Sequence, residues 1–576
     1  PSHMVMPAIH YSKEDVADLF TSYTKEKEVP DISKEVKTAR RVMREKFLTA
    51  EMGVSGANAA VAETGTVITM SNEGNGRMVG TLPASHMYIF GIEKFVAKMS
   101  DIRYIFKVLP RNGTAQNLTT YLSFYTGATD VVTDPENDTK QKKSFHIIIL
   151  DTPERRKIMT DPDYQDIFCC IRCAACLNVC PAFRLVGGHV YGGNIYTGGI
   201  GTLLTAFLNS RERGKEIQNI CLQCGTCNTV CGGKLDIAGM ILKLRTKYAQ
   251  EDGLNPIHKF CLDTVADRHL FHSMLRIASV AQGAITKGQP MIRHMPMFLS
   301  GLTSGRSLPS IAPQPFRDVL PSIKQDVPNP KGKIAIFTGC LLDFVYVDIA
   351  TAVVKALNMA GYVVEMPLGQ SCCGAPATYM GDADNAKKAA ELNIEAMEAE
   401  KYDYIVSACP TCTHALRDYK EMFKDDPEMY KKASELSDKS YDFSKLLHML
   451  GGLPDNGDGV PMKVTYHDSC HMKRYMGVYK EQRELLEGTK GVEIVEMNNC
   501  DKCCGFGGSY SIKFPEMSAP MLEEKIDNIV ATGADTVAVD CPGCLLQIKG
   551  GLDARGLNNI QVKHTAQILV EKREKQ

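Results

Sequence analysis

Apolar positions near the start of the chain have helical spacing, and later ones form short runs typical of strands. Four apolar residues after Ser12 fall on one face of a helix, which predicts a capped amphipathic helix. From residue 40 to about residue 151, β-prone runs alternate with helical stretches, so an α/β domain is expected there. The apolar residues are Val16, Leu19, Phe20 and Tyr23, and the runs are residues 67–70, 87–90 and 145–150.

Residues 165–250 carry two dense cysteine groups separated by a Gly-rich turn region and a helical stretch, which predicts a compact, mainly helical module. One helix is expected over residues 262–280, and the Pro-rich stretch after it predicts a linker. Residues 293–299 are a candidate for contact with a membrane surface. A linker packed on neighbouring parts of the chain is the favoured interpretation.

After residue 331 the pattern repeats at an offset of 130 to 132 residues. In each copy, three predicted strands run into a single cysteine, a Cys-Cys-Gly motif and a Cys-Pro-x-Cys motif. Ligands in open α/β sheets bind outside the carboxyl ends of the strands, so the three cysteine groups of a copy should converge there. The predicted strands are residues 333–337, 362–366 and 404–408 in the first copy, and 464–467, 492–496 and 536–539 in the second.

The charge balance excludes some classes of function. Lys plus Arg (66) nearly equal Asp plus Glu (67) over 576 residues, whereas a nucleic-acid-binding protein normally has a basic excess. The sequence has no apolar stretch of transmembrane length and no signal-peptide pattern, so a cytoplasmic protein is expected. In that compartment its 21 cysteines are better explained as metal ligands or redox groups than as disulfides.

The first two cysteine runs have the spacing of a two-cubane ferredoxin, Cys-x2-Cys-x2-Cys-x3-Cys. In that arrangement three cysteines of a run bind one [4Fe-4S] cluster and the fourth binds the other cluster. Zinc is the alternative, but the spacing fits zinc sites poorly. The predicted ligands are Cys170, Cys173, Cys176 and Cys231 for cluster 1, and Cys221, Cys224, Cys227 and Cys180 for cluster 2.

Each copy of the repeat offers five cysteines, one more than a cubane needs. These are Cys340, Cys372, Cys373, Cys409 and Cys412 in the first copy, and Cys470, Cys503, Cys504, Cys541 and Cys544 in the second. Both copies resemble the CCG domain of heterodisulfide reductases, and this resemblance implies a non-cubane [4Fe-4S] cluster in each. Empty scaffolds or zinc sites remain the alternative for one or both copies.

Three histidines flank the cysteine groups and are candidates for proton relay or for tuning potentials through hydrogen bonds to sulfur. They are His189, His467 and His471. The other interpretation of each histidine is purely structural. Cys169, Cys261 and Cys500 are left without a role.

Several motifs before and within the cysteine-rich module point to one family. Residues 53–58, 62–66, 72–77 and 91–94 resemble the LUD domain of lactate-utilisation iron-sulfur proteins. Residues 170–181 and 187–192 are similar to the LutB (LldF) subunit, and residues 331–576 to the LutA (LldE) subunit. The chain therefore resembles a fusion of the two, with the LUD domain expected to lack about its first half. The segment 74–80 departs from a dinucleotide loop, so no flavin or NAD site is predicted.

The resemblance implies a multidomain α/β protein, whose LUD part has a NagB/RpiA-like fold. The expected domains are a truncated LUD-like domain (1–164), a two-cluster ferredoxin-type domain (165–250), a helical and Pro-rich linker (251–330) and two CCG domains (331–460 and 461–576).

The function that the resemblance implies is electron transfer in a lactate dehydrogenase complex, with a separate flavoprotein or electron-transferring flavoprotein as partner. Two alternatives stay open: a heterodisulfide or thiol reductase acting at the non-cubane clusters, and a pure electron carrier to quinone or flavoprotein.

Overall fold

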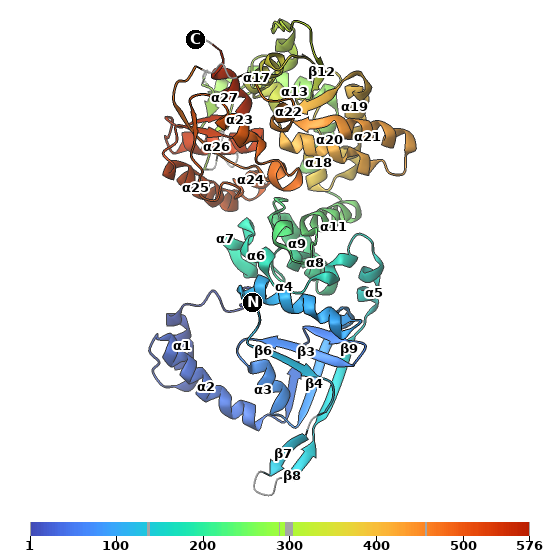
Figure 1. The fold of residues 1–576 in the computed structure, drawn as a ribbon, viewed down its shortest axis with the longest axis vertical. Coiled ribbons are helices and arrows are strands. Elements are labelled where there is room, and N and C mark those ends of the chain that lie inside the picture. Colours follow the sequence, from blue (N-terminus) through green and yellow to red (C-terminus); the bar gives the residue numbers. More distant parts are fainter. Residues whose placement is uncertain are drawn as a thin grey trace. The chain divides into compact units, whose positions relative to one another are not determined.

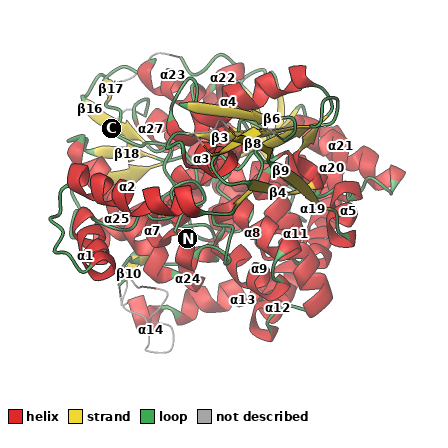
Figure 2. Cartoon of the chain, turned by 90° about the horizontal axis from the view of Figure 1, so that it is seen from below, coloured by secondary structure: helices red, strands yellow, loops and turns green. Residues whose placement is uncertain are grey.

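The computed structural model describes residues 2–128, 130–134, 139–286, 289–293, 303, 305–454 and 458–574. It divides into two compact units (Figure 1): residues 1–218 with 227–241, and residues 219–226 with 242–576. The multidomain α/β class expected from the sequence is confirmed, and Figure 2 shows short sheets among many helices. None of the described helices has the length and apolar character needed to cross a membrane.

The first unit opens with two helices and three small sheets. Ser12 caps the first helix in a capping box with Asp15, as its sequence predicts. The predicted strands 67–70, 87–90 and 145–150 lie within β3, β4 and β9 and are confirmed. The helices are α1 (Lys13–Thr24), α2 (Ile32–Thr49), α3 (Asn75–Thr81), α4 (Ile102–Thr114) and α5 (Pro153–Thr160).

The sheets of this unit pair in the orders β1-β4-β9, β5-β2-β3-β6 and β7-β8. The first is parallel throughout. Its edge strand β9 exposes four successive apolar side chains, from Ile147 to Leu150. The strands are β1 (Met52–Ser55), β2 (Ala59–Val61), β3 (Thr66–Ser71), β4 (Ser85–Gly91), β5 (Phe95–Val96), β6 (Tyr121–Tyr125), β7 (Asp130–Asp134), β8 (Thr139–Lys142) and β9 (Ser144–Leu150).

The cysteine-rich module that follows is helical. Pro181 begins α7 directly after Cys180, where its fixed φ suits a helix start. The helices are α6 (Ala175–Asn178), α7 (Pro181–Val190), α8 (Gly198–Leu208), α9 (Arg211–Ile217), α10 (Thr226–Val230) and α11 (Ile237–Asp252), with a 3₁₀ turn η3 (Gln165–Cys169) before them.

The single helix expected over residues 262–280 is wrong. The structure has two helices, α12 (Pro256–Ala266) and α13 (Arg268–Ala281), because Asp267 leaves the helical conformation and its side chain accepts a hydrogen bond from the Leu270 N–H, capping α13. The short elements α14 (Gly283–Thr286), β10 (Met291–Ile292), β11 (Leu308–Pro309) and α15 (Phe316–Val319) follow. Most of the candidate membrane-contact stretch, residues 294–299, lies outside the described residues.

The two copies of the repeat form two parallel four-stranded sheets with the same strand order, β13-β12-β14-β15 and β17-β16-β18-β19. All six predicted strands are confirmed. The strands are β12 (Gly332–Ile336), β13 (Tyr362–Glu365), β14 (Tyr404–Ser407) and β15 (Ser440–Asp442) in the first copy, and β16 (Met462–Tyr466), β17 (Val492–Ile494), β18 (Thr536–Ala538) and β19 (Gln561–Lys563) in the second.

Helices cover these sheets, and one apolar core runs through both copies, from Ile334 in β12 to Val537 in β18. The copies therefore fold as a single body. Their helices are α16 (Leu341–Phe344), α17 (Val347–Met359), α18 (Ala375–Met380), α19 (Ala383–Met397), α20 (Pro410–Met422), α21 (Pro427–Lys439) and α22 (Phe443–Met449), then α23 (Glu481–Glu487), α24 (Tyr510–Lys513), α25 (Pro515–Ala531), α26 (Pro542–Ala554) and α27 (Thr565–Glu571).

Candidate iron-sulfur centres

The first cysteine set surrounds a small cavity within the first unit. Cys170, Cys173, Cys176 and Cys231 line it together with apolar side chains such as Ile200. Burial raises the pKa of Cys176, and the neighbouring cysteines raise it further. Bound iron would offset this repulsion because its positive charge favours thiolates. The four predicted ligands of cluster 1 thus share one cavity of fitting chemistry.

The two cubane-type loops have the same unusual backbone conformation. Arg172 and Ala174 both have φ of 63°, and the matching residues of the second run, Gln223 and Gly225, have φ of 59° and 69°. Non-glycine residues adopt this left-handed region rarely, and when they do the strain is typical of functional loops. The second run therefore has the geometry of the first. Its predicted ligands Cys221 and Cys224 belong to the second unit, whereas Cys180 and Cys227 belong to the first.

In the first CCG copy, the structure brings the five sulfurs together at the carboxyl ends of the strands. The Cys340 thiol hydrogen-bonds to Cys372, and the Cys372 thiol hydrogen-bonds to Cys373. The Cys412 thiol hydrogen-bonds to both Cys373 and Cys409. Gly374 follows the cysteine pair with φ of 77°, and a Cβ there would lie 3.1 Å from the Cβ of Ala389. A glycine is therefore needed for α18 to start directly after the pair.

The second copy repeats this arrangement. The sulfurs of Cys504 and Cys544 lie 3.3 Å apart, and Cys503 and Cys541 hydrogen-bond to them. The remaining cysteine, Cys470, is close enough for Cys541 and Cys504 to raise the pKa of its buried thiol. Each copy thus holds five converging sulfurs.

In the Cys-Cys-Gly motif of each copy, the second cysteine has a lowered pKa and is the favoured thiolate. Hydrogen bonds from Cys372 and Cys412 lower the pKa of Cys373. Hydrogen bonds from Cys503 and Cys544, with a contribution from His467, hold the pKa of Cys504 well below its ordinary value. A buried thiolate among thiols requires a cation, so the donor set of both sites fits a multi-iron cluster.

The three candidate histidines lie in different environments. His189 is exposed, with its ring 5.0 Å from that of His10. His471 is within a buried network, where its Nδ1 lies 3.4 Å from Cys470 Sγ and its Nε2 lies 2.6 Å from Tyr379 Oη. Burial lowers the pKa of His471 to about 3, so the ring is neutral. His467 is buried behind Cys504 and Cys544.

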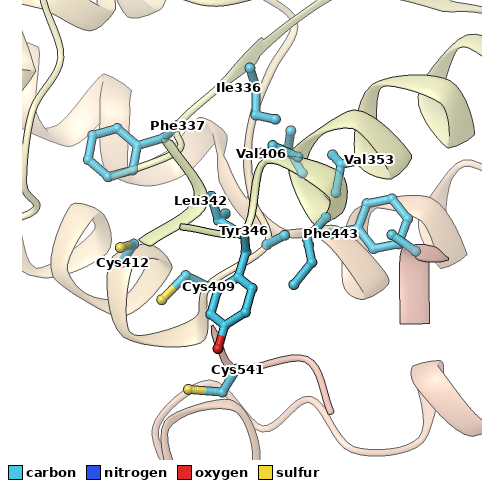
Figure 3. Close-up of a cluster of buried hydrophobic side chains, with 14 of the residues drawn as sticks. Ile336, Phe337, Leu342, Tyr346, Val353, Val406, Cys409, Cys412, Phe443 and Cys541 are labelled. Atoms are coloured by element: carbon cyan, nitrogen blue, oxygen red, sulfur yellow. The ribbon is translucent and has the colours of Figure 1, made fainter. Parts of the chain in front are cut away.

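Aromatic residues that were not predicted lie between the two CCG sites. The Tyr346 ring lies beside Cys409 of the first copy, and its hydroxyl points toward Cys541 of the second copy (Figure 3). This hydroxyl is buried without a hydrogen-bond partner. Tyr346 follows Cys340 by six residues, and Tyr475 follows Cys470 by five. An aromatic residue shortly after the first cysteine of each copy was therefore the sequence feature from which these two tyrosines could have been predicted.

The loop that carries Cys221 and Cys224 is anchored on the second CCG copy, within the second unit. The Tyr475 hydroxyl donates to the Gln223 carbonyl at 2.9 Å, and the Arg474 guanidinium contacts the Cys224 carbonyl at 3.4 Å. Arg245 also donates to the Cys221 carbonyl at 3.1 Å. The cubane-type loop is therefore held directly beside Cys470.

Comparisons with known proteins agree with this organisation. Residues 2–150 match the LUD domain, residues 166–235 the 4Fe-4S dicluster domain, and residues 334–417 and 464–549 the cysteine-rich CCG domain. Lactate utilization protein A of Shouchella clausii is 40% identical over 240 residues, which cover 42% of this chain and 99% of that protein. The probable glycolate oxidase iron-sulfur subunit of Bacillus subtilis is 30% identical over 425 residues, covering 71% and 94%.

The chain belongs to this family of iron-sulfur proteins. It is also 36% identical over 257 residues to lactate utilization protein B of Bacillus velezensis, covering 45% of this chain and 52% of that protein. The family member described here thus joins segments similar to proteins A and B, and its matches span about half to two thirds of the length of the protein B relatives. The resemblance inferred from the motifs is confirmed.

Proposed function

We propose that the chain is the iron-sulfur electron-transfer component of a complex that oxidises a 2-hydroxy acid such as lactate. Two cubane and two non-cubane [4Fe-4S] clusters are expected, at the four cysteine sets predicted from the sequence. Family membership and the convergence of each five-sulfur set support this function. When bound, such clusters accept and donate single electrons.

The observation that carries the proposal is the anchoring of the Cys221–Cys224 loop on the second CCG copy. Tyr475, Arg474 and Arg245 hold three carbonyls of this loop, those of Gln223, Cys224 and Cys221. These contacts hold Cys221 and Cys224 close to the second CCG site. An electron relay needs its centres to be held close together.

The electron balance requires a partner. Oxidation of a 2-hydroxy acid to the 2-oxo acid releases two electrons and two protons, whereas iron-sulfur clusters of this kind carry electrons singly. A separate flavoprotein that takes the pair and releases one electron at a time would resolve this. The final acceptor is expected to be a quinone or an electron-transferring flavoprotein.

A second candidate function is thiol or disulfide reduction at a CCG site. It is favoured by the lowered pKa of the Cys373 and Cys504 thiols, because the thiolate is the form that attacks a disulfide sulfur. Turnover of lactate with an added flavoprotein, compared with turnover of a disulfide with reduced viologen, separates the two functions. Cluster reduction by partners with neither turnover would indicate a pure electron carrier.

The first prediction concerns metal content. Protein purified under strict anoxia should contain about 16 irons per chain, because four sites of four irons each are expected. Iron, sulfide and zinc analysis with electron paramagnetic resonance (EPR) of the oxidised and reduced forms checks this. About 8 irons, or zinc in place of iron, would contradict the assignment of clusters to the CCG copies.

The second prediction concerns the anchored loop. Tyr475→Phe should slow electron transfer into the second CCG site by about threefold or more, because the loop loses a hydrogen bond worth about 1 kcal/mol. Stopped-flow reduction followed at the cluster absorbance measures the rate. Tyr479→Phe is the matched control, since Tyr479 is exposed, and it should leave the rate unchanged. Equal rates in both variants would show that the loop anchor does not limit transfer.

A further inference from the structure

The two CCG copies differ at one position beside their cysteines. Phe337 and His467 occupy the same place in the repeat, directly after β12 and β16. The N–H of Phe337 donates to the Val406 carbonyl at 2.8 Å, and the N–H of His467 donates to the Ala538 carbonyl at 3.0 Å, which are equivalent bonds to the third strand of each sheet. One copy therefore has an apolar ring where the other has an imidazole.

The hydrogen bond of His467 fixes its tautomer. Its Nδ1 lies 3.0 Å from the Cys500 carbonyl oxygen. A carbonyl only accepts, so Nδ1 carries the proton, and in the neutral ring Nε2 is left with a free lone pair. The same carbonyl also accepts from the buried Lys525 Nζ at 3.2 Å, which holds it in place. His467 is thus oriented with a bare nitrogen at its other end.

That bare nitrogen faces the cluster ligands. A ring nitrogen of His467 and the sulfurs of Cys504 and Cys544 all lie within 4.8 Å of one another. Because Nδ1 is bonded to the Cys500 carbonyl, Nε2 is the nitrogen left for this role. Nε2 is buried and no donor reaches it, while the His467 side chain lies close enough to Cys504 to help lower the pKa of that thiol. Leaving such an atom unpaired costs free energy, and a metal ion is a partner that suits both a lone pair and two sulfurs. Histidines that ligate metals ordinarily donate their other ring N–H to a carbonyl or carboxylate, as His467 does.

We propose that His467 Nε2 is a ligand to iron at the second CCG site, whereas the first site binds iron through sulfur alone. This rests on the proposed function only in requiring iron at the second site. The two sites are then chemically distinct. If the imidazole takes the place of one of the five thiolates on iron, the second site should have the higher reduction potential, because replacement of thiolate by imidazole raises the potential of iron-sulfur centres.

The test is pulsed EPR of the full-length, iron-loaded protein in the redox state where the second site is paramagnetic. A strongly coupled nitrogen is expected, and it should change when the protein is labelled with ¹⁵N-histidine. It should disappear in His467→Phe, which copies the residue of the first repeat. His189→Phe, at an exposed site, should keep it. A redox titration should also show a lower potential for the second site in His467→Phe.

The outcomes separate this inference from the proposed function. If Cys504→Ser removes an EPR signal but no strongly coupled nitrogen is found in the labelled wild-type protein, iron is present and His467 is not its ligand. An exchangeable proton coupling that is lost in His467→Phe would likewise overturn ligation in favour of a hydrogen bond. If Cys504→Ser changes no signal, the second site holds no cluster and the proposed function itself fails. The labelled wild type decides the question even if His467→Phe does not fold.

Discussion

Replacing Cys504 by serine should remove the cluster of the second CCG site and stop electron flow through it. Iron should fall by about four per chain, since one four-iron site is lost. Turnover with the flavoprotein partner should fall by about 100-fold or more, because loss of a ligand costs at least as much as loss of the groups that support it. Cys504 is buried within this set, and its sulfur lies 3.3 Å from that of Cys544.

Iron analysis, EPR and turnover of the same preparations check this result. Cys261→Ser is the matched control, because Cys261 is exposed on α12, and it should keep wild-type iron and activity. Cys373→Ser is the corresponding change in the first copy and should also remove about four irons. Full iron and an unchanged spectrum in Cys504→Ser would contradict its role as a ligand.

Arg317→Met should destabilise the second unit by about 3–5 kcal/mol, because it leaves the buried Asp343 carboxylate without its partner. The guanidinium of Arg317 lies 2.6 Å from this carboxylate, which is fully buried. Burial raises the pKa of Asp343, and Arg317 opposes that shift. Arg317 also donates to the carbonyls of Leu368 and Gln370, just before the cysteine pair of the first site. Iron at that site should therefore fall as well.

Chemical denaturation followed by circular dichroism, together with iron analysis, measures both effects. Arg276→Met is the matched control, because the ion pair of Arg276 with Asp318 is exposed on both sides. It should cost less than about 1 kcal/mol. Similar losses of unfolding free energy and of iron in the two variants would show that the Arg317–Asp343 pair does not connect the loops of the first site.

Strands with continuous apolar runs could be predicted from the sequence, and short polar ones could not. The residues of β12 and β16 are mostly apolar and repeat at a fixed offset, so both strands were predicted. The fourth strand of each sheet, β15 and β19, was missed. Each has only three residues and little apolar character, and each is fixed by pairing with β14 or β18.

The candidate sites show the same division. Cysteine spacing and the rule for parallel sheets were enough to predict which sulfurs meet in the first cubane-type set and in the two CCG copies, because both depend on chain order alone. The set predicted for cluster 2 stays a prediction. The position of Tyr346 depends on how one copy packs on the other, and that of Tyr475 on how residues 219–226 pack on the second copy. The imidazole of His467 was a candidate by position, but its free Nε2 follows from a hydrogen bond to Cys500, 33 residues away.

Strand β9 bears on how the protein can be handled in solution. It is the edge of its sheet, and its side chains from Ile147 to Leu150 are each about two-fifths exposed. An unpaired edge with a row of apolar side chains is a template for pairing with another chain. We therefore expect the protein to self-associate as its concentration rises. EPR requires high protein concentrations, so self-association should be seen first in those samples.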